Sequence, residues 1–137
     1  MKNKVRIVET YIYPVVRYGL EAVSWTKTLQ SKIQVFQNDL MRLLTGNNKL
    51  DKVRIEKLNE MTNLKHLFEN IKKDKESLFC KTKTSIKGVS KICLEGLVEG
   101  KRSRDRPRRR WTDDLKEWSN SKTIQEAFIK IREKFGN

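Results

Sequence analysis

The stretch LQSKIQVFQNDLMRLLTG, residues 29–46, carries the clearest structural signal in the chain. Its apolar residues recur in steps of three and four, which is the spacing of one face of an α-helix. We expect a helix from about Ser31, or slightly earlier, to Thr45. Gly46 marks its end, because glycine accepts the left-handed conformation that closes helices. The predicted apolar face consists of Leu29, Ile33, Phe36, Leu40, Leu43 and Leu44.

The segment upstream, from Val5 to Tyr18, also places its apolar residues on one side of a helix. Proline lacks an amide donor and its ring clashes with the preceding turn, so Pro14 should kink or break this helix. β-branched residues are dense here, which leaves a strand as the rival interpretation.

Downstream of Gly46, helical spacing returns twice. Asp51 is expected to cap a short helix that ends near Met61. Thr62 and Asn63 are then expected to open a longer helix. Its predicted inward residues are Leu64, Leu67, Phe68, Ile71, Leu78 and Phe79, and its outward residues are Lys72, Lys73 and Lys75. The three lysines form a weaker basic patch.

The last part of the chain predicts two more helices. Asp113 and Asp114 suit the positive end of a helix that stops near residues 119–121. Thr123 and Glu126 form a capping box that opens a closing helix to Phe135.

The predicted organisation has three regions. A helical region covers residues 1–79, and a C-terminal pair of helices covers 112–137. Between them, residues 80–111 form a loop and an Arg-rich segment, because helical spacing fades where Ser, Thr, Lys and Gly dominate. The fold class is therefore mainly α, a small multi-helix module with an irregular basic segment between its helices.

The composition limits the classes of function. The 137 residues include 31 Lys and Arg against 17 Asp and Glu, a net charge of +14. This excess favours a polyanionic partner. Apolar runs are too short for a transmembrane helix or a secretory signal core, so we expect no membrane partner. Two cysteines cannot form a disulfide framework, and a reduced intracellular setting follows.

No catalytic constellation is visible. The six Gly are scattered, without the spacing of a phosphate loop. His66 is far in sequence from Cys80 and Cys93, whereas zinc sites usually show close ligand pairs. Asp113 and Asp114 are interpreted as helix-capping acids rather than magnesium ligands. We expect no enzyme activity from this chain, no cofactor and no metal site.

Residues 100–111, GKRSRDRPRRRW, are the most informative segment for function. Seven of the ten residues from Lys101 to Arg110 are basic and one is acidic, which gives +6. Like charges repel and Pro107 fixes its own φ, so we expect an extended segment. Guanidinium forks match phosphate oxygens bidentately. The predicted nucleic-acid contacts are Lys101, Arg102, Arg104, Arg106, Arg108, Arg109 and Arg110.

Trp111 ends the basic run, where an aromatic ring can stack on a base. The alternative is that Trp111, like Trp118, packs against the C-terminal helices, and the sequence leaves both open for Trp111. Phosphate contacts carry no sequence information, so RNA, DNA and a hybrid all remain candidate partners.

Two blocks of the chain resemble the reverse transcriptases of non-LTR retrotransposons. Residues 13–27, YPVVRYGLEAVSWTK, are similar to the stretch after the polymerase core in that family, and residues 29–46 resemble the helix that follows it. Residues 96–115, GLVEGKRSRDRPRRRWTDDL, are similar to the family's C-terminal block, and 124–135 to its closing helix. Asp105 stands where the family has Gly, and the family's Trp-x-Gly-His segment has no counterpart between residues 70 and 83.

The resemblance implies the thumb and tail of a larger polymerase, with residues 1–79 as a thumb-like region that grips the template–primer backbone. In the family, the palm with its Asp-Asp magnesium site lies upstream and outside this chain, so the upstream polymerase domains become a candidate partner. The alternatives are a stand-alone chromatin- or RNA-binding protein and a non-functional, degenerate retroelement remnant. We expect an intracellular, nuclear location, and the oligomeric state stays open.

Overall fold

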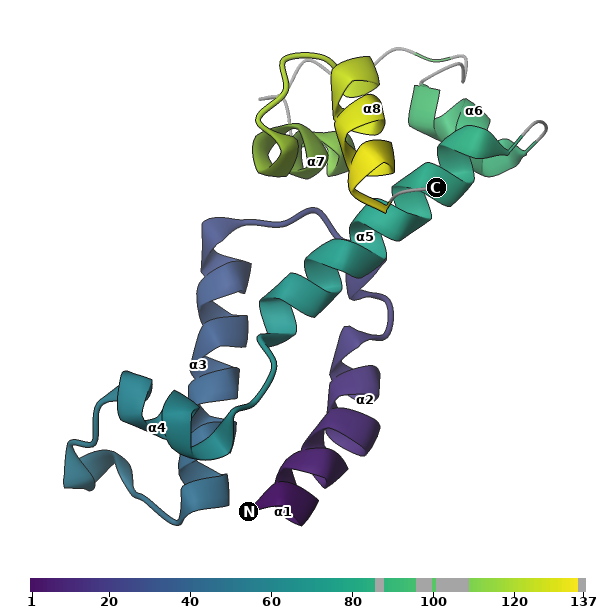
Figure 1. Ribbon diagram of the computed structural model, residues 1–137. Coiled ribbons are helices and arrows are strands. Elements are labelled where there is room, and N and C mark those ends of the chain that lie inside the picture. Colours follow the sequence, from purple (N-terminus) through teal and green to yellow (C-terminus); the bar gives the residue numbers. More distant parts are fainter. Residues whose placement is uncertain (86–87, 96–99, 101–108, 136–137) are drawn as a thin grey trace. The chain divides into compact units, whose positions relative to one another are not determined.

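The computed structural model describes residues 1–85, 88–95, 100 and 109–135, and these residues are mainly helical, with no strand among them (Figure 1). The predicted mainly α, multi-helix class is confirmed. The chain divides into two compact units. Unit 1 comprises Met1–Glu21 and Thr26–Lys72, and unit 2 comprises Ala22–Trp25 and Lys73–Asn137. This division lies within a helix and differs from the boundary after residue 79 expected from the sequence.

Unit 1 begins with a helical run that contains Pro14. The run consists of α1 (Lys2–Ile7), the π-helix η1 (Val8–Ile12) and α2 (Tyr13–Arg17), so the strand interpretation is wrong. In η1 the N–H of Tyr13 bonds to the carbonyl of Val8, five residues back. The wider π turn accommodates a proline that would clash with a regular α-helical turn. The interruption expected at Pro14 is therefore a local widening rather than a break. A short 3₁₀ turn, η2 (Leu20–Ala22), follows.

Helix α3 (Lys27–Thr45) has the predicted end and a slightly earlier start. The Thr26 hydroxyl caps it by accepting a hydrogen bond from the Leu29 N–H at 3.2 Å. Gly46 closes it with a φ of 74°, in the left-handed region. Its buried face differs from the prediction, because Leu43 is 77% exposed while Gln37 and Met41 are buried.

Gln37 is buried because both ends of its amide are paired. Its Nε2 donates to the carbonyl of Lys65 at 3.4 Å, and its Oε1 accepts the N–H of Leu67 at 3.1 Å. The Tyr13 hydroxyl donates to the same Lys65 carbonyl at 2.9 Å, and burial raises the pKa of Tyr13. These bonds hold residues 65–67, which lead into the helix that begins at Leu67, against α2 and α3.

The region after α3 differs from the sequence prediction in two places. Asp51 lies in a 3₁₀ turn, η3 (Lys49–Asp51), where it accepts the N–H of Asn48 at 2.6 Å, so it does not cap α4 (Ile55–Thr62). Asn63 has a φ of 48° and closes α4 instead of opening the next helix. Asparagine adopts the left-handed conformation readily, which suits a helix end as well as a start. Helix α5 (Leu67–Thr84) begins four residues later.

Unit 2 contains the rest of α5, α6 (Val89–Glu95), α7 (Trp111–Ser119) and α8 (Ile124–Phe135). The loop expected from residue 80 onwards is wrong for residues 80–84 and 89–95, which are helical. Lys83 on α5 pairs with Glu95 on α6 at 2.6 Å, a contact between segments that local spacing does not reveal. Helix α7 ends as predicted, with Asn120 in the left-handed region. The Thr123 hydroxyl accepts the Glu126 N–H at 3.3 Å, as expected for a capping box.

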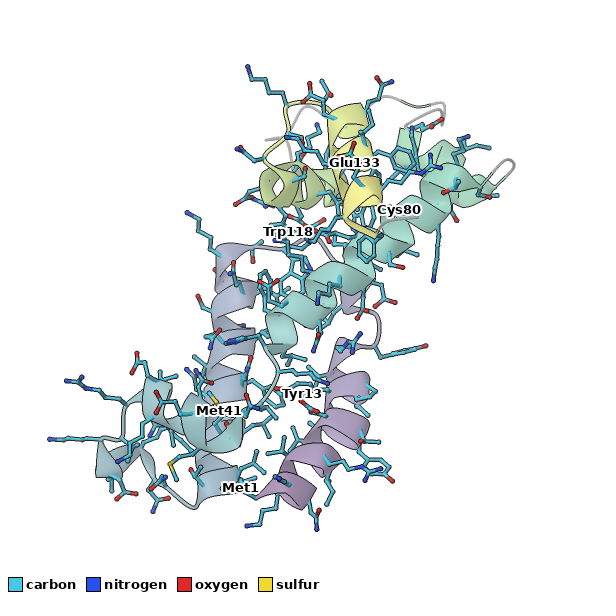
Figure 2. The ribbon with its side chains drawn as sticks, viewed as in Figure 1. Met1, Tyr13, Met41, Cys80, Trp118 and Glu133 are labelled. Carbon is cyan, nitrogen blue, oxygen red and sulfur yellow. The ribbon has the colours of Figure 1, made fainter. Side chains whose placement is uncertain are left out.

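The core of unit 2 joins three helices. Phe79 of α5, Leu115 of α7 and Ile131 of α8 are buried together. Phe128 meets the Phe79 ring edge-on, with centroids 5.9 Å apart. The partly buried residues packed against this core are Cys80, Leu94, Trp111, Trp118, Ile124 and Phe128, of which Cys80 and Trp118 are labelled in Figure 2.

The burial pattern of unit 1 predicts the cost of removing one leucine. Leu58 on α4 is fully buried, whereas Leu50 on the preceding loop is 88% exposed. We expect Leu58→Ala to lower the free energy of unfolding by about 2–5 kcal/mol, because it leaves a cavity. Leu50→Ala should change it by no more than about 0.5 kcal/mol. Urea denaturation followed by far-ultraviolet circular dichroism measures both, and equal losses in the two variants would contradict the placement of α4.

Candidate nucleic-acid interface

The structure describes only the end of the predicted basic contact segment. Lys101, Arg102, Arg104, Arg106 and Arg108 lie outside the described residues, whereas Arg109, Arg110 and Trp111 are described. These three residues occupy different environments.

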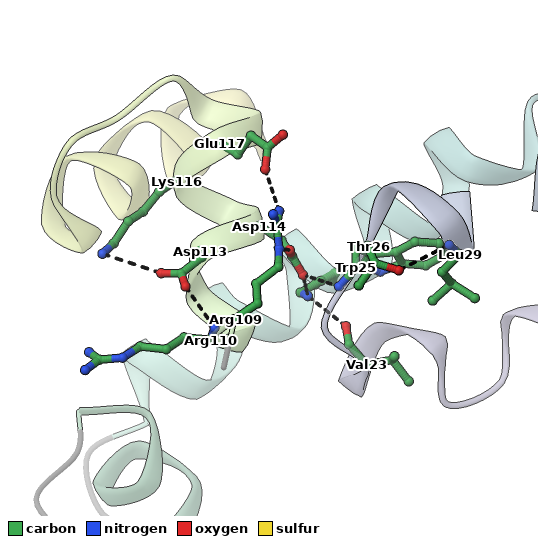
Figure 3. A network of polar contacts seen from close by, with 11 residues as sticks. Val23, Trp25, Thr26, Leu29, Arg109, Arg110, Asp113, Asp114, Lys116 and Glu117 are labelled. Atoms are coloured by element: carbon green, nitrogen blue, oxygen red, sulfur yellow. Dashed lines mark hydrogen bonds and ion pairs between the residues drawn. The ribbon is translucent and has the colours of Figure 1, made fainter. Parts of the chain in front are cut away.

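Arg109 is engaged within the protein rather than free. Its Nε donates to Asp114 Oδ1 at 2.7 Å, and its Nη2 donates to Glu117 Oε2 (Figure 3). The hydrogen bonds that the guanidinium donates to Glu117 and Asp114 raise the pKa of Arg109. The two carboxylates thus bind the guanidinium that was predicted to bind phosphate. The described geometry therefore gives Arg109 a structural contact.

Arg110 has an exposed side chain that extends away from the polar network in Figure 3. Its backbone N–H donates to Asp113 Oδ2 at 2.8 Å, which fastens the start of α7. Asp113 thus has the helix-capping role that the sequence predicted for both aspartates. Arg110 keeps its guanidinium available for an external partner.

Asp114 is fully buried and does more than complement the helix dipole. Its Oδ2 accepts the backbone N–H of Trp25 at 2.7 Å and a hydrogen bond from Lys75 Nζ, while its Oδ1 accepts from Arg109. Three donors share this one carboxylate, and two of them, Trp25 and Lys75, are distant from it in the chain. A buried carboxylate needs such pairing, because removing a charge from water costs several kcal/mol.

The predicted outward patch of Lys72, Lys73 and Lys75 is wrong for Lys75, which is buried. Lys73 is exposed and Lys72 is half-buried, but the Lys75 side chain has no exposed surface. Its Nζ donates to Asp114 and to the carbonyl of Val23, the latter at 2.9 Å. Burial lowers the pKa of Lys75, and the hydrogen bond that its ammonium donates to Asp114 opposes that shift. A signal for this burial was present, because Lys75 lies four residues from both Ile71 and Phe79 on the buried face of α5.

Trp111 and Trp118 surround this lysine. The Lys75 Nζ lies 4.9 Å from the Trp111 ring centroid and 5.6 Å from that of Trp118, within the range of cation–π attraction. Phe79 contacts Trp111 with centroids 6.3 Å apart. Both tryptophans are half-buried and pack against the core of unit 2. Of the two interpretations of Trp111, packing is the one that the structure displays.

We call Lys75, Arg109, Asp114 and Glu117 the ion cluster of unit 2. The charged groups of this cluster pair with one another, so their role is to stabilise the fold of unit 2. Within the described residues, no group of three or more His, Cys, Asp or Glu side chains is placed to hold a metal ion, and no helix is long and apolar enough to cross a membrane. No family model, curated protein or solved structure matches the chain.

The ion cluster predicts a large difference between two adjacent aspartates. We expect Asp114→Ala to lower the free energy of unfolding by about 3–5 kcal/mol, because it leaves the charge of Lys75 buried without a counter-ion. Asp113→Ala, the matched control, removes one exposed helix-capping bond and should cost about 1 kcal/mol. Trp25, Trp111 and Trp118 all lie in unit 2, so tryptophan fluorescence during urea denaturation follows its unfolding.

A paired replacement separates the charge from the shape of the site. Lys75→Met together with Asp114→Asn removes both charges and keeps an acceptor for the Trp25 N–H. We expect this double variant to be more stable than Asp114→Ala alone, since no unpaired charge stays buried. A double variant less stable than Asp114→Ala would show that the unpaired charge of Lys75 is not what destabilises the single variant.

Proposed function

We propose that this chain binds nucleic acid through the phosphate backbone and catalyses nothing by itself. The observation that carries the proposal is the concentration of positive charge, +6 between Lys101 and Arg110 within a chain of net charge +14. Six of the seven cations in this run are arginines, whose planar guanidinium fits phosphate oxygens bidentately. This preference for arginine favours phosphate contact over a merely solubilising role. The partner is RNA, DNA or a hybrid of the two.

The described residues refine the set of proposed contacts. Arg109 is paired with Asp114 and Glu117, so its role is to fasten the end of the basic segment to α7. Trp111 packs beside Lys75 and is not proposed to stack on a base. The proposed phosphate contacts are Lys101, Arg102, Arg104, Arg106, Arg108 and Arg110.

We further propose that the chain derives from the thumb and tail of a non-LTR retrotransposon reverse transcriptase. The support is the pair of sequence blocks at 13–27 and 96–115, in the order and separation that the family shows. A second support is an apolar exposed stripe on α1, η1 and α2, where Val15 is 76% and Tyr18 90% exposed. Such a stripe suits the docking of upstream polymerase domains. The polymerase chemistry, with its magnesium ions, would belong to those domains.

Salt dependence tests the proposed phosphate contacts. If about five phosphates are neutralised, the logarithm of affinity should fall with the logarithm of salt concentration at a slope of roughly −3.5 to −4.5. Replacing Arg104, Arg106 and Arg108 with Ala should flatten that slope by about two to three. Arg109 is kept, because its loss would disturb the ion cluster. Filter binding of single-stranded RNA, single-stranded DNA and a hybrid duplex at several salt concentrations measures the slope.

A charge-matched control removes three cations elsewhere. Lys27, Lys32 and Lys122 have exposed side chains, and replacing all three with Ala lowers the net charge by the same amount. This control should leave the slope nearly unchanged. An unchanged slope in the arginine variant, or equal flattening in both variants, would remove the basic segment as the contact surface. A strong base-composition preference would favour a stand-alone chromatin- or RNA-binding protein.

The absence of catalysis is tested by primer extension. The purified chain with template, primer, deoxynucleotides and magnesium should give no product above background, because it contains no recognised palm. Extension above background that persists after further purification would contradict the proposal.

A further inference from the structure

We propose that an open pocket between α3 and α4 of unit 1 is a second phosphate-binding site. The pocket has a volume of about 980 Å³ and lies apart in sequence from the basic segment. The inference rests on the proposed function for the source of the phosphate, which is a nucleic-acid strand. The site itself rests on three features of unit 1.

The first feature is the excess of cations around the pocket. Arg42 of α3 and Lys52, Arg54 and Lys57 at the start of α4 line it, with Glu56 and Glu60 as the acids. Among the described residues, none of these six side chains forms an ion pair, although oppositely charged groups line the same space. Unlike the cations of the ion cluster, these cations are not neutralised by an ion pair among the described residues.

The second feature is Arg42. Its side chain is half-buried, and its Nη1 is enclosed without a hydrogen-bond partner among the described residues. An enclosed guanidinium nitrogen without an acceptor is unfavourable in free energy, because its hydrogen bonds to water are lost and no protein acceptor replaces them. Because Arg42 also lines the pocket, a rotation of its guanidinium toward an anion there would supply the missing acceptor. Phosphate is the anion whose oxygens the guanidinium fork fits bidentately.

The third feature is the start of α4. Arg54 occupies the N-cap position without a side-chain hydrogen bond to the helix, where Ser, Thr, Asp or Asn would normally provide one. Ile55, Glu56 and Lys57 form the first turn and line the pocket. Helix N-termini attract anions through their free N–H groups and the helix dipole. The uncapped turn and Arg42 thus border the same space.

Because the pocket is open to solvent, it can admit a phosphate group that is part of a larger ester. Glu56 and Glu60 can accept hydrogen bonds from hydroxyl or amino groups of a nucleotide. The site has no local sequence signature, because its residues come from two helices and the segment between them, without the glycine-rich spacing of a phosphate loop.

Nuclear magnetic resonance titration with inorganic phosphate tests the site directly. At constant ionic strength against chloride, we expect saturable shifts of the backbone amides of Ile55, Glu56 and Lys57. Arg42→Gln should weaken this binding about tenfold, the loss expected for one charge-assisted hydrogen bond. Arg6→Gln, an exposed arginine of the same unit, is the matched control and should leave it unchanged. Lys57→Gln should also weaken binding, and its exposed side chain makes loss of folding no explanation.

A second titration with a short oligothymidylate identifies the source of the phosphate. Shifts of the same α4 amides, weakened by Arg42→Gln, support the site and its nucleic-acid ligand. Oligonucleotide shifts confined to residues 101–110, with no response of α4 to either ligand, would overturn this site and leave the proposed function standing. Binding of inorganic phosphate at α4 without any oligonucleotide binding would support the site and overturn the proposed function. Equal effects of the Arg42 and Arg6 variants would overturn the site.

Discussion

Unit 2 depends on one buried carboxylate. Asp114 has no access to water, and its charge is tolerated only because a lysine, an arginine and a backbone N–H donate to it. These donors come from Lys75 on α5, from Arg109 before α7 and from Trp25 near the beginning of the chain. A single side chain therefore fixes segments that are up to 89 residues apart in sequence. The surrounding tryptophans shield the pair and add attraction for the ammonium group.

The ion cluster also changes how the positive charge of the chain is understood. Net charge counts Lys75 and Arg109 as available cations, yet both are committed to Asp114. By contrast, Arg42 lies at an open pocket, with an enclosed nitrogen that has no partner among the described residues. A cation's capacity to bind a phosphate thus depends on its neighbours, which composition does not report. The proposed interface rests on the cations that the described structure leaves unpaired and on those of the basic segment.

Local signals were sufficient for much of the fold. Gly46 and Asn120 end helices where expected, and Thr123 caps α8, because these residues act within one turn of their own position. Lys75 and Gln37 were misjudged because their burial depends on partners 39 and 28 residues away. The spacing of Lys75 from Ile71 and Phe79 indicates its burial, but no local pattern identifies Asp114 as the partner of Lys75 or Lys65 as the partner of Gln37. The basic segment was recognisable from charge alone, whereas the phosphate pocket needed α3 and α4 placed in space.

The discontinuity of unit 2 has a consequence for biosynthesis. Ala22–Trp25 emerge from the ribosome before the rest of unit 2, and the acceptor for the Trp25 N–H is translated only with α7. Unit 1 has all of its residues once Lys72 has been added. Because segments fold as they are synthesised, unit 1 assembles before unit 2. The Trp25 N–H gains its acceptor only when α7 has been added. Until α7 and α8 have been added, Phe79 of α5 lacks Leu115 and Ile131, the core residues that bury it, and exposed apolar surface of this kind is what chaperones bind.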